Sequence, residues 1–282
     1  MRLSATYLKE GTVHIVACTK PTPDTTASLS VDAKGNVSWG DLKPVTNPWD
    51  EYAIEEALRL KEKFSGKVTT LCVGVVSMGP GPNKDVLKDA VARGCDAAQL
   101  VWDEALAGSD TLATARVLAA GIKKLGDVQL AIFGRQAIDG DTGHTAVQAA
   151  RLLGWPALTY VAKIVEIDPK AGTITVERML EEGRQVVASK LPAVLTVVKE
   201  INEPRYPTFM GIRKASKLDV PTWSLADLGL APAAVGMAGS GLVWPVVKPL
   251  PPRAGTVKMI QGATPEEIAQ NLVDALVADK VI

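Results

Sequence analysis

Along most of the chain, short apolar runs alternate with segments whose apolar residues recur every three or four positions. The strands expected from this pattern are 13–19, 68–77, 97–102 and 128–133, and the helices are 48–66, 85–93, 110–126 and 142–153. Alternation of this kind predicts parallel strands joined by crossover helices. We therefore expect an α/β fold with a Rossmann-like, doubly wound and mostly parallel sheet.

The pattern changes after Pro156. Four further strand-like runs, 158–167, 173–179, 185–190 and 193–198, follow one another with short turns and no helix between them. This spacing predicts added antiparallel or mixed strands.

The first helix has a start signal at 47–50. Asn47 is a candidate N-cap, and Pro48 suits the first helical position, where no N–H is needed.

The C-terminal part has a different composition. Residues 228–256 are rich in Pro and small residues, as in an extended segment without its own core. Thr264, Pro265 and Glu267 then form a capping box that begins a terminal amphipathic helix. We divide the chain into an α/β domain, 1–227, with a loop at 200–217, and an arm, 228–282. A helix this short needs a surface, so we expect it to pack on a partner subunit or on its own domain.

Composition narrows the classes of function. The 31 Lys and Arg balance the 31 Asp and Glu, so nothing indicates a nucleic-acid or anionic-membrane partner. The apolar runs are shorter than the ~20 residues that cross a bilayer, and early charges argue against a secretory signal, so we expect no membrane insertion and a cytoplasmic protein. The three cysteines form no CxxC pair, which favours buried, reduced thiols over a disulfide or zinc site.

Two segments follow strands at the edge where open parallel sheets bind ligands, 17–24 and 134–145. In the second, small residues precede a helix whose first turn lacks large side chains, so backbone N–H groups can approach a phosphate. The pattern predicts an anionic nucleotide. The chain contains no GxGxxG, no GxxxxGK[ST] and no nucleophile elbow.

The polar residues near this loop do not indicate catalysis. Asp139 and Asp141 could bind a metal or a ribose hydroxyl, but aspartates at such a boundary are more often turn formers, and we predict no metal. His144 could titrate beside an anion, and His14 lies within the first strand. Neither has a Ser or Cys partner at a defined spacing, so we expect no catalytic side chain.

Several blocks, in order, carry a family resemblance: Asn-Pro-Trp-Asp at 47–50, Ser-Met-Gly-Pro at 77–80, Gly-Arg-Gln-Ala-Ile-Asp-Gly-Asp at 134–141, Leu-Pro-Ala at 191–193 and Asn-Glu-Pro-Arg-Tyr at 202–206. Residues 12–218 resemble the β subunit of electron transfer flavoprotein, and the tail resembles the longer, bifurcating or nitrogen-fixation-type members. The resemblance implies a heterodimer whose α subunit carries an FAD that the β subunit helps to enclose. It implies an electron carrier in which flavins do the redox chemistry.

The resemblance also implies that the β subunit binds an adenine nucleotide. This is AMP in ordinary members, which accept electrons from acyl-CoA dehydrogenases, and a second FAD in bifurcating members. The segments that match the family's nucleotide contacts comprise Cys18, Thr19, Asn47, Pro48, Trp49, Asp50, Met78, Gly79, Gly134, Arg135, Gln136, Ala137, Ile138, Asp139, Gly140, Asp141, Thr142, Gly143, His144 and Thr145.

The stretch 139–143, Asp-Gly-Asp-Thr-Gly, is similar to the bifurcating pattern. Gly140 and Gly143 leave room for a pyrophosphate, which favours FAD over AMP. With FAD, the resemblance implies NADH as hydride donor, and electrons that divide between the flavin of α and ferredoxin or flavodoxin. His144 departs from the family's usual Gln, and Ala146-Val147 from a common Gly-Pro, so both alternatives stay open.

The segment 203–211 resembles the recognition loop by which β subunits anchor on acyl-CoA or other flavin dehydrogenases. The docking residues implied are Tyr206, Thr208, Phe209 and Met210, with Phe209 as the apolar anchor. A competing class is a nucleotide-binding regulatory protein of the universal-stress type, which shares the α/β layout but forms homodimers without redox function. Such a protein would lack the arm.

Overall fold

A computed structural model describes residues 13–32, 35, 37–38, 43–242, 244, 246–249, 251 and 255–282. Nine strands form its central sheet: β1 (His14–Cys18), β6 (Lys67–Val73), β7 (Ala97–Val101), β8 (Val128–Gly134), β9 (Ala157–Asp168), β10 (Thr173–Leu180), β11 (Gly183–Lys190), β12 (Ala193–Val197) and β13 (Thr222–Trp223). Their order is β11-β10-β9-β12-β8-β1-β6-β7-β13. The pairs from β9-β12 to β7-β13 are parallel, whereas β10 pairs antiparallel with β9 and β11. The prediction of a mostly parallel sheet with added mixed strands is confirmed.

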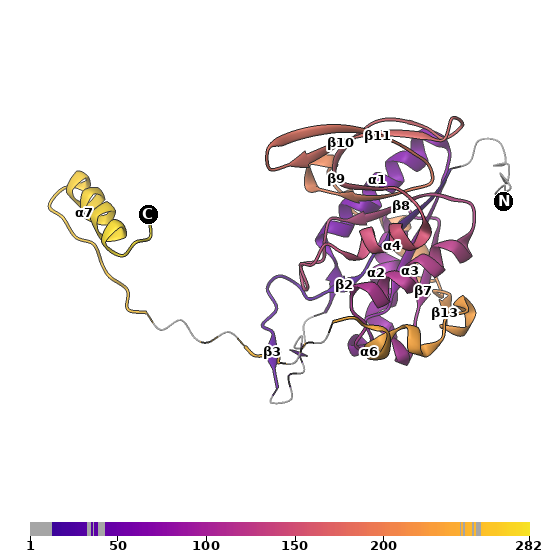
Figure 1. Cartoon of the computed structure of the whole chain (residues 1–282), viewed down its shortest axis with the longest axis horizontal. Helices are drawn as coiled ribbons and strands as arrows, with labels where there is room; N and C mark the ends of the chain where they lie inside the picture. Colours follow the sequence, from indigo (N-terminus) through magenta and orange to yellow (C-terminus); the bar gives the residue numbers. More distant parts are fainter. Residues whose placement is uncertain are drawn as a thin grey trace.

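Each face of the sheet has its own helices and core. On one face lie α1 (Pro48–Phe64), α2 (Pro80–Arg93) and α5 (Phe209–Ser216), and on the other α3 (Thr111–Leu125) and α4 (Thr145–Leu153). Because successive strand residues point to opposite faces, Ile15 and Ala17 of β1 pack with α1, whereas Val16 and Cys18 belong to the α3 and α4 core. The sheet and these helices together form one layered body (Figure 1).

Three predicted boundaries were wrong. The second strand ends at Val73 rather than near 77, and α2 begins at Pro80 rather than at 85. Asn83 explains the early start, since its amide donates to the carbonyls of Val75 and Gly79 and its oxygen accepts from the Val75 N–H. The helix expected from 142 begins at Thr145, and the predicted loop 200–217 contains the helix α5.

Residues 226–242 lie on the α/β body as short helical turns: η4 (Ala226–Leu228), η5 (Pro232–Ala234) and α6 (Gly236–Gly239). Leu228, Leu230 and Val235 join the core beneath α3. The guanidinium of Arg116 on α3 donates to the Ala234 carbonyl at 3.0 Å. The segment 228–256, which we expected to lack a core of its own, therefore begins by packing on the α/β domain. The domain boundary at 227 stays a prediction.

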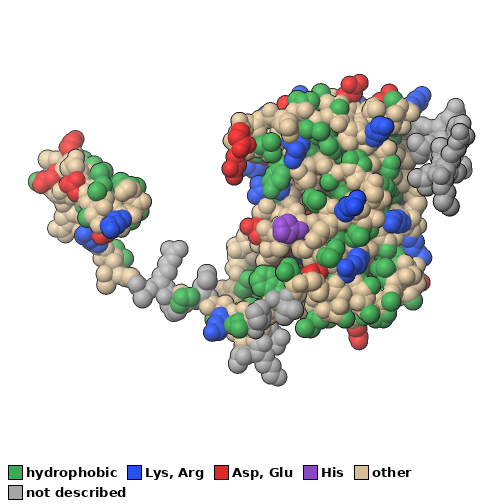
Figure 2. Space-filling model, viewed as in Figure 1, with side chains coloured by type: hydrophobic (Ala, Val, Ile, Leu, Met, Phe, Trp, Pro, Cys, Tyr) green, Lys and Arg blue, Asp and Glu red, His purple; other side chains and the backbone are tan. Residues whose placement is uncertain are grey.

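The terminal helix α7 (Pro265–Ala278) stands apart from the body, and its hydrophobic side chains are visible in the space-filling view (Figures 1 and 2). The Thr264 hydroxyl accepts from the Glu267 N–H at 3.2 Å, and the Glu267 carboxylate accepts from the Ala263 N–H at 2.7 Å, so the N-terminal cap is confirmed. Leu272 and Val273 are exposed. Among the described helices, none is long and apolar enough to cross a membrane.

Candidate functional site

A cavity of about 620 Å³ opens where β1, β6 and β8 end. Its walls come from the segments after these strands, 18–20, 73–77 and 133–146, and from the start of α3, 106–114, together with Leu242 and Trp244 of the arm. Parallel strands bring their carboxyl ends to one edge of the sheet, which is where open α/β sheets bind ligands. The volume is in the range of small-molecule and cofactor sites, roughly 300–1,000 Å³.

The structure brings most of the predicted nucleotide contacts together around this cavity. Those that line it are Cys18, Thr19, Asn47, Asp50, Gly134, Arg135, Gln136, Ala137, Asp139, Gly140, Thr142, Gly143, His144 and Thr145. Those that do not line it are Pro48, Trp49, Met78, Gly79, Ile138 and Asp141. Most of the second group adjoin lining residues in the chain, as Pro48 does at the first position of α1.

Three segments that line the cavity were not predicted from the sequence as parts of the site. Val75 and Val76 follow β6, Ser109 and Asp110 precede α3, and Leu242 and Trp244 come from the arm. Asp110 is also the N-cap of α3, since its carboxylate accepts from the Ala113 N–H at 2.8 Å. The adjacency of β6 and β7 could have placed the start of α3 near the site. Nothing in the pattern of the arm indicated its place.

Asn47 connects two segments of the site. Asn47 stands at the predicted N-cap position of α1, but its side chain makes no capping bond to a backbone N–H of the helix. Instead the amide nitrogen donates to the Gln136 carbonyl at 2.9 Å, and the amide oxygen accepts from the Ile138 N–H at 3.2 Å. Asn47 thus fixes the loop after β8 to the start of α1.

Asp50 connects the first turn of α1 to the ends of β1 and β8. Its carboxylate accepts from the backbone N–H of Lys20 at 3.0 Å and from that of Gly134 at 3.3 Å. Burial raises the pKa of Asp50 to about 7, although hydrogen bonds from Asn47, Lys20 and Gly134 act in the opposite direction. A Cβ at Gly134 would stand 2.5 Å from the Trp49 carbonyl carbon, so only glycine allows this approach of β8 to α1.

In the loop after β8, Asp139 and Asp141 are bonded to other side chains, whereas Gly140 between them has open space beside it. The Lys20 ammonium forms an ion pair with Asp139, at 2.8 Å, and the Gln136 amide donates to Asp141. A Cβ at Gly140 would meet no atom within 4 Å, and Gly143 has a φ of +63°. Within the described residues, no three His, Cys, Asp or Glu side chains cluster as a metal site would require. Asp139 is therefore engaged with a lysine, and the glycine stretch is free to approach a ligand.

The chemistry of the walls suits an aromatic ring attached to an anion. Val73, Leu106, Leu118 and Phe133 supply apolar surface, and the loop 139–145 leads into the N-terminus of α4, where backbone N–H groups favour an anion. Burial raises the pKa of the Cys18 thiol well above its usual value, so this thiol stays protonated and is no nucleophile.

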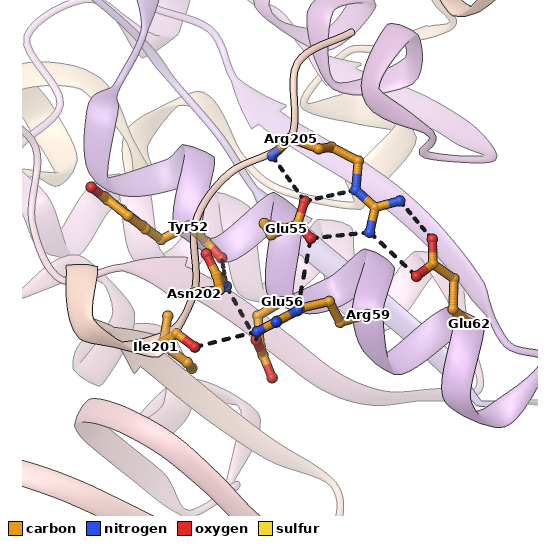
Figure 3. A network of polar contacts seen from close by, with 8 residues as sticks. All are labelled: Tyr52, Glu55, Glu56, Arg59, Glu62, Ile201, Asn202 and Arg205. Carbon is orange, nitrogen blue, oxygen red and sulfur yellow. Dashed lines mark hydrogen bonds and ion pairs between the residues drawn. The ribbon is translucent and has the colours of Figure 1, made fainter. Parts of the chain in front are cut away.

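A second polar network runs along α1 and holds Asn202 and Arg205 (Figure 3). They begin the segment 202–210, which we call the docking segment after the role predicted for it. Arg205 donates from Nε to Glu55 at 2.7 Å and from Nη2 to the other Glu55 oxygen at 3.0 Å, and it also pairs with Glu62. Asn202 donates to the Tyr52 carbonyl at 3.0 Å. The hydrogen bond from Arg205 lowers the pKa of Glu62, and the two glutamates raise the pKa of Arg205.

The docking segment presents apolar side chains to solvent. Tyr206 is 89% exposed, Phe209 81% and Met210 68%. The Thr208 hydroxyl accepts from the Gly211 N–H at 3.0 Å and so caps α5, which fixes the two residues that follow it. Exposed aromatic residues on a rigid support are typical of interface anchors.

Comparison with known families decides the identity. The profile described as "Electron transfer flavoprotein domain" matches residues 41–228. The chain belongs to the electron transfer flavoprotein family. Its relatives include the caffeyl-CoA reductase-Etf complex subunit CarD of Acetobacterium woodii, 39% identical over 96% of this chain and all of CarD, and the electron transfer flavoprotein subunit beta of Clostridium acetobutylicum, 42% identical over 81% of this chain and 85% of that protein. Protein FixA of Bradyrhizobium diazoefficiens is 34% identical over 94% of this chain and 91% of its own length.

As an electron transfer flavoprotein β subunit, the chain is one half of a heterodimeric electron carrier. The family binds FAD and AMP, and β subunits pair with an α subunit. The likeness to CarD and FixA confirms the predicted resemblance to the longer branch. It sets aside the alternative of a universal-stress-type regulatory protein.

Proposed function

We propose that this β subunit belongs to an electron-bifurcating heterodimer and binds FAD in the cavity beyond β1, β6 and β8. The observation that carries the proposal is the glycine stretch at 139–143. Gly140 has open space where a side chain would stand, and a Cβ at Gly143 would meet only the Arg135 carbonyl, at 3.5 Å. This backbone can approach a pyrophosphate closely.

The residues around the cavity fit FAD. The apolar wall of Val73, Leu106, Leu118 and Phe133 can cover rings, and residues 140–145 lie at the start of α4, where N–H groups favour phosphate. Bound FAD would supply hydride acceptance and one-electron transfer. The protein's own part is to hold the loop in place through Asn47, Asp50 and Lys20, and to exclude bulk water.

The electron balance of the proposed activity involves three partners. A hydride from NADH, which carries two electrons and one proton, would pass to FAD in the β site and leave NAD+. One electron would then reach the FAD of the α subunit and the other a low-potential acceptor, ferredoxin or flavodoxin, while the proton is released to solvent. The relatives support this assignment only by name, since one is a subunit of a caffeyl-CoA reductase-Etf complex and others are FixA proteins. The docking segment, with Tyr206, Thr208, Phe209 and Met210, would bind a flavin dehydrogenase.

A second candidate is an ordinary β subunit that holds AMP and accepts electrons from acyl-CoA dehydrogenases. Ala146 and Val147, in the first turn of α4, favour it, because they replace a Gly-Pro that is common in bifurcating members, and Ala146 lines the cavity. The two candidates share the heterodimer and the docking segment.

The test is the nucleotide content of the heterodimer purified after co-expression with its α subunit. Two FAD per heterodimer and no AMP support the proposal. One FAD with releasable AMP would assign the chain to the second candidate, and a preparation without flavin or adenylate would defeat both. Reduction by NADH, followed in the flavin absorbance, is the independent readout.

A further inference from the structure

The arm contributes to the nucleotide cavity before it leaves the body. Leu242 and Trp244 line the cavity together with the loop after β8. Both are large apolar side chains left in contact with solvent, and the Trp244 indole is 75% exposed. Hydrophobic side chains gather where the arm leaves the body (Figure 2).

A dense set of hydrogen bonds fixes the chain just before these two residues. Asp110, at the start of α3, accepts from the N–H groups of Gly241 at 2.7 Å and Leu242 at 3.2 Å. Its own N–H donates to the Ser240 hydroxyl at 2.8 Å, and that hydroxyl donates to the Gly108 carbonyl at 3.0 Å. The same carboxylate caps α3, so residues 240–242 are held to the wall of the cavity itself.

The fit between α6 and the turn before α3 leaves little freedom. A Cβ at Gly108 would stand 2.3 Å from Met237 Cγ, and one at Gly236 would stand 2.2 Å from the Ala105 carbonyl oxygen. Burial would raise the pKa of Asp110, but N–H donors from Ala113, Gly241 and Leu242 lower it below its usual value, so the carboxylate is charged and its bonds are strong.

We propose that Trp244 is a binding residue of the nucleotide cavity, where its indole covers an aromatic ring of the bound nucleotide and makes the arm one wall of the site. This rests on the proposed function, because it requires an adenine nucleotide in the cavity. Val73, Leu118 and Phe133 line the same cavity, so a ring covered by Trp244 would lie among further apolar side chains. Stacking of a base on an aromatic side chain is the sequence-tolerant mode of nucleotide binding.

The test uses the complete heterodimer and compares Trp244→Ala with Val246→Ala. Val246 belongs to the same arm, is also exposed and does not line the cavity, so it is a matched control. The native nucleotide is identified first in the wild type. The heterodimer is then stripped and reloaded with FAD or with AMP, and the dissociation rate of each is measured.

We expect Trp244→Ala to release at least one of the two ligands about ten-fold faster than the wild type, and Val246→Ala to stay within about two-fold. Trp244→Phe should restore most of the retention, since it keeps a ring. Acceleration for FAD alone identifies the isoalloxazine as the covered ring, and acceleration for both identifies the adenine.

Equal rates for wild type, Trp244→Ala and Val246→Ala overturn the inference while the proposed function stands. Unchanged rates together with weaker heterodimer assembly would reassign Trp244 to the subunit interface. A wild-type heterodimer without any adenine nucleotide removes the proposed function, and the inference with it. Because the indole is exposed, Trp244→Ala should fold, and its thermal midpoint checks this.

Discussion

The side-chain oxygen of Asn47 accepts a hydrogen bond from the backbone N–H of Ile138 at 3.2 Å. The two residues are far apart in the sequence, one before α1 and the other in the loop after β8. Their bond, with that from the Asn47 amide to the Gln136 carbonyl, determines where this loop stands over the cavity. The residue that looked like a helix cap is thus part of the nucleotide site.

Asn47→Ala should therefore weaken nucleotide binding. The loop would lose both bonds, and a carbonyl and an N–H would lack partners at a cost of about 1–3 kcal/mol. We expect the affinity for added AMP or FAD to fall about ten-fold, measured by calorimetry on the stripped heterodimer. Asn271→Ala is the control, because its amide donates to the Gln261 carbonyl on the remote α7 segment. Equal affinities for both variants would contradict the prediction.

Asp50 should make stability depend on pH. Burial raises its folded-state pKa from 3.8 to about 7, so the folded protein holds this proton more tightly than the unfolded chain. The contribution is fully present below about pH 4, decreases as the pH rises and is lost above about 7. Asp50→Asn cannot ionise and should lack this loss.

The measurement is urea unfolding of wild type and Asp50→Asn, without nucleotide, at pH 5 and pH 8. Between these values the wild type should lose free energy of unfolding relative to the variant, by an amount on the order of 1–3 kcal/mol. Titrations common to both proteins cancel in the difference. A difference that stays constant with pH would show that Asp50 ionises normally.

Arg205→Ala should destabilise the docking segment. The Glu55 side chain, which is nearly buried, would keep its charge without the guanidinium that now binds both of its oxygens. Loss of one partner of such a pair costs about 3–5 kcal/mol when the charge is fully buried, and less here because Arg205 is partly exposed. We expect a lower thermal midpoint and more than ten-fold weaker binding of an acyl-CoA dehydrogenase, with nucleotide content unchanged.

Arg184→Ala is the matched control for Arg205→Ala, because it removes an exposed ion pair with Glu177 on the β10–β11 hairpin. Arg205→Lys should restore only part of the binding, since an ammonium cannot engage two carboxylates in the planar geometry of arginine. Dehydrogenase binding that survives Arg205→Ala unchanged would disprove the positioning role.

Gly140→Asp distinguishes the two candidate nucleotides. The space beside Gly140 is open, so the variant should fold, but its carboxylate would occupy the approach to a pyrophosphate. We expect the FAD content of the β site to fall several-fold while AMP is retained. Gly81→Asp, in the first turn of α2 with equally open surroundings, should change neither. Full FAD retention in Gly140→Asp would contradict pyrophosphate binding at this loop.

The fold followed from local patterns because each predicted strand or helix carries its own periodicity. The errors arose where long-range contacts override local preference. The Asn47 side chain bonds to the loop after β8 instead of capping its own helix. The Asn83 side chain bonds to the turn before α2, so that the helix begins at Pro80. Trp244 shows the limit for the site, since a segment without periodicity carries no signal for its place in the fold.

Helix α1 has one more consequence. Its first turn, at Asn47 and Asp50, supports the nucleotide cavity, whereas Glu55 and Glu62 farther along the same helix hold Arg205 and the docking segment. A continuous helix is a stiff rod, so both attachments share one rigid frame. A partner bound at Phe209 would thus sit at a set distance and angle from the cavity.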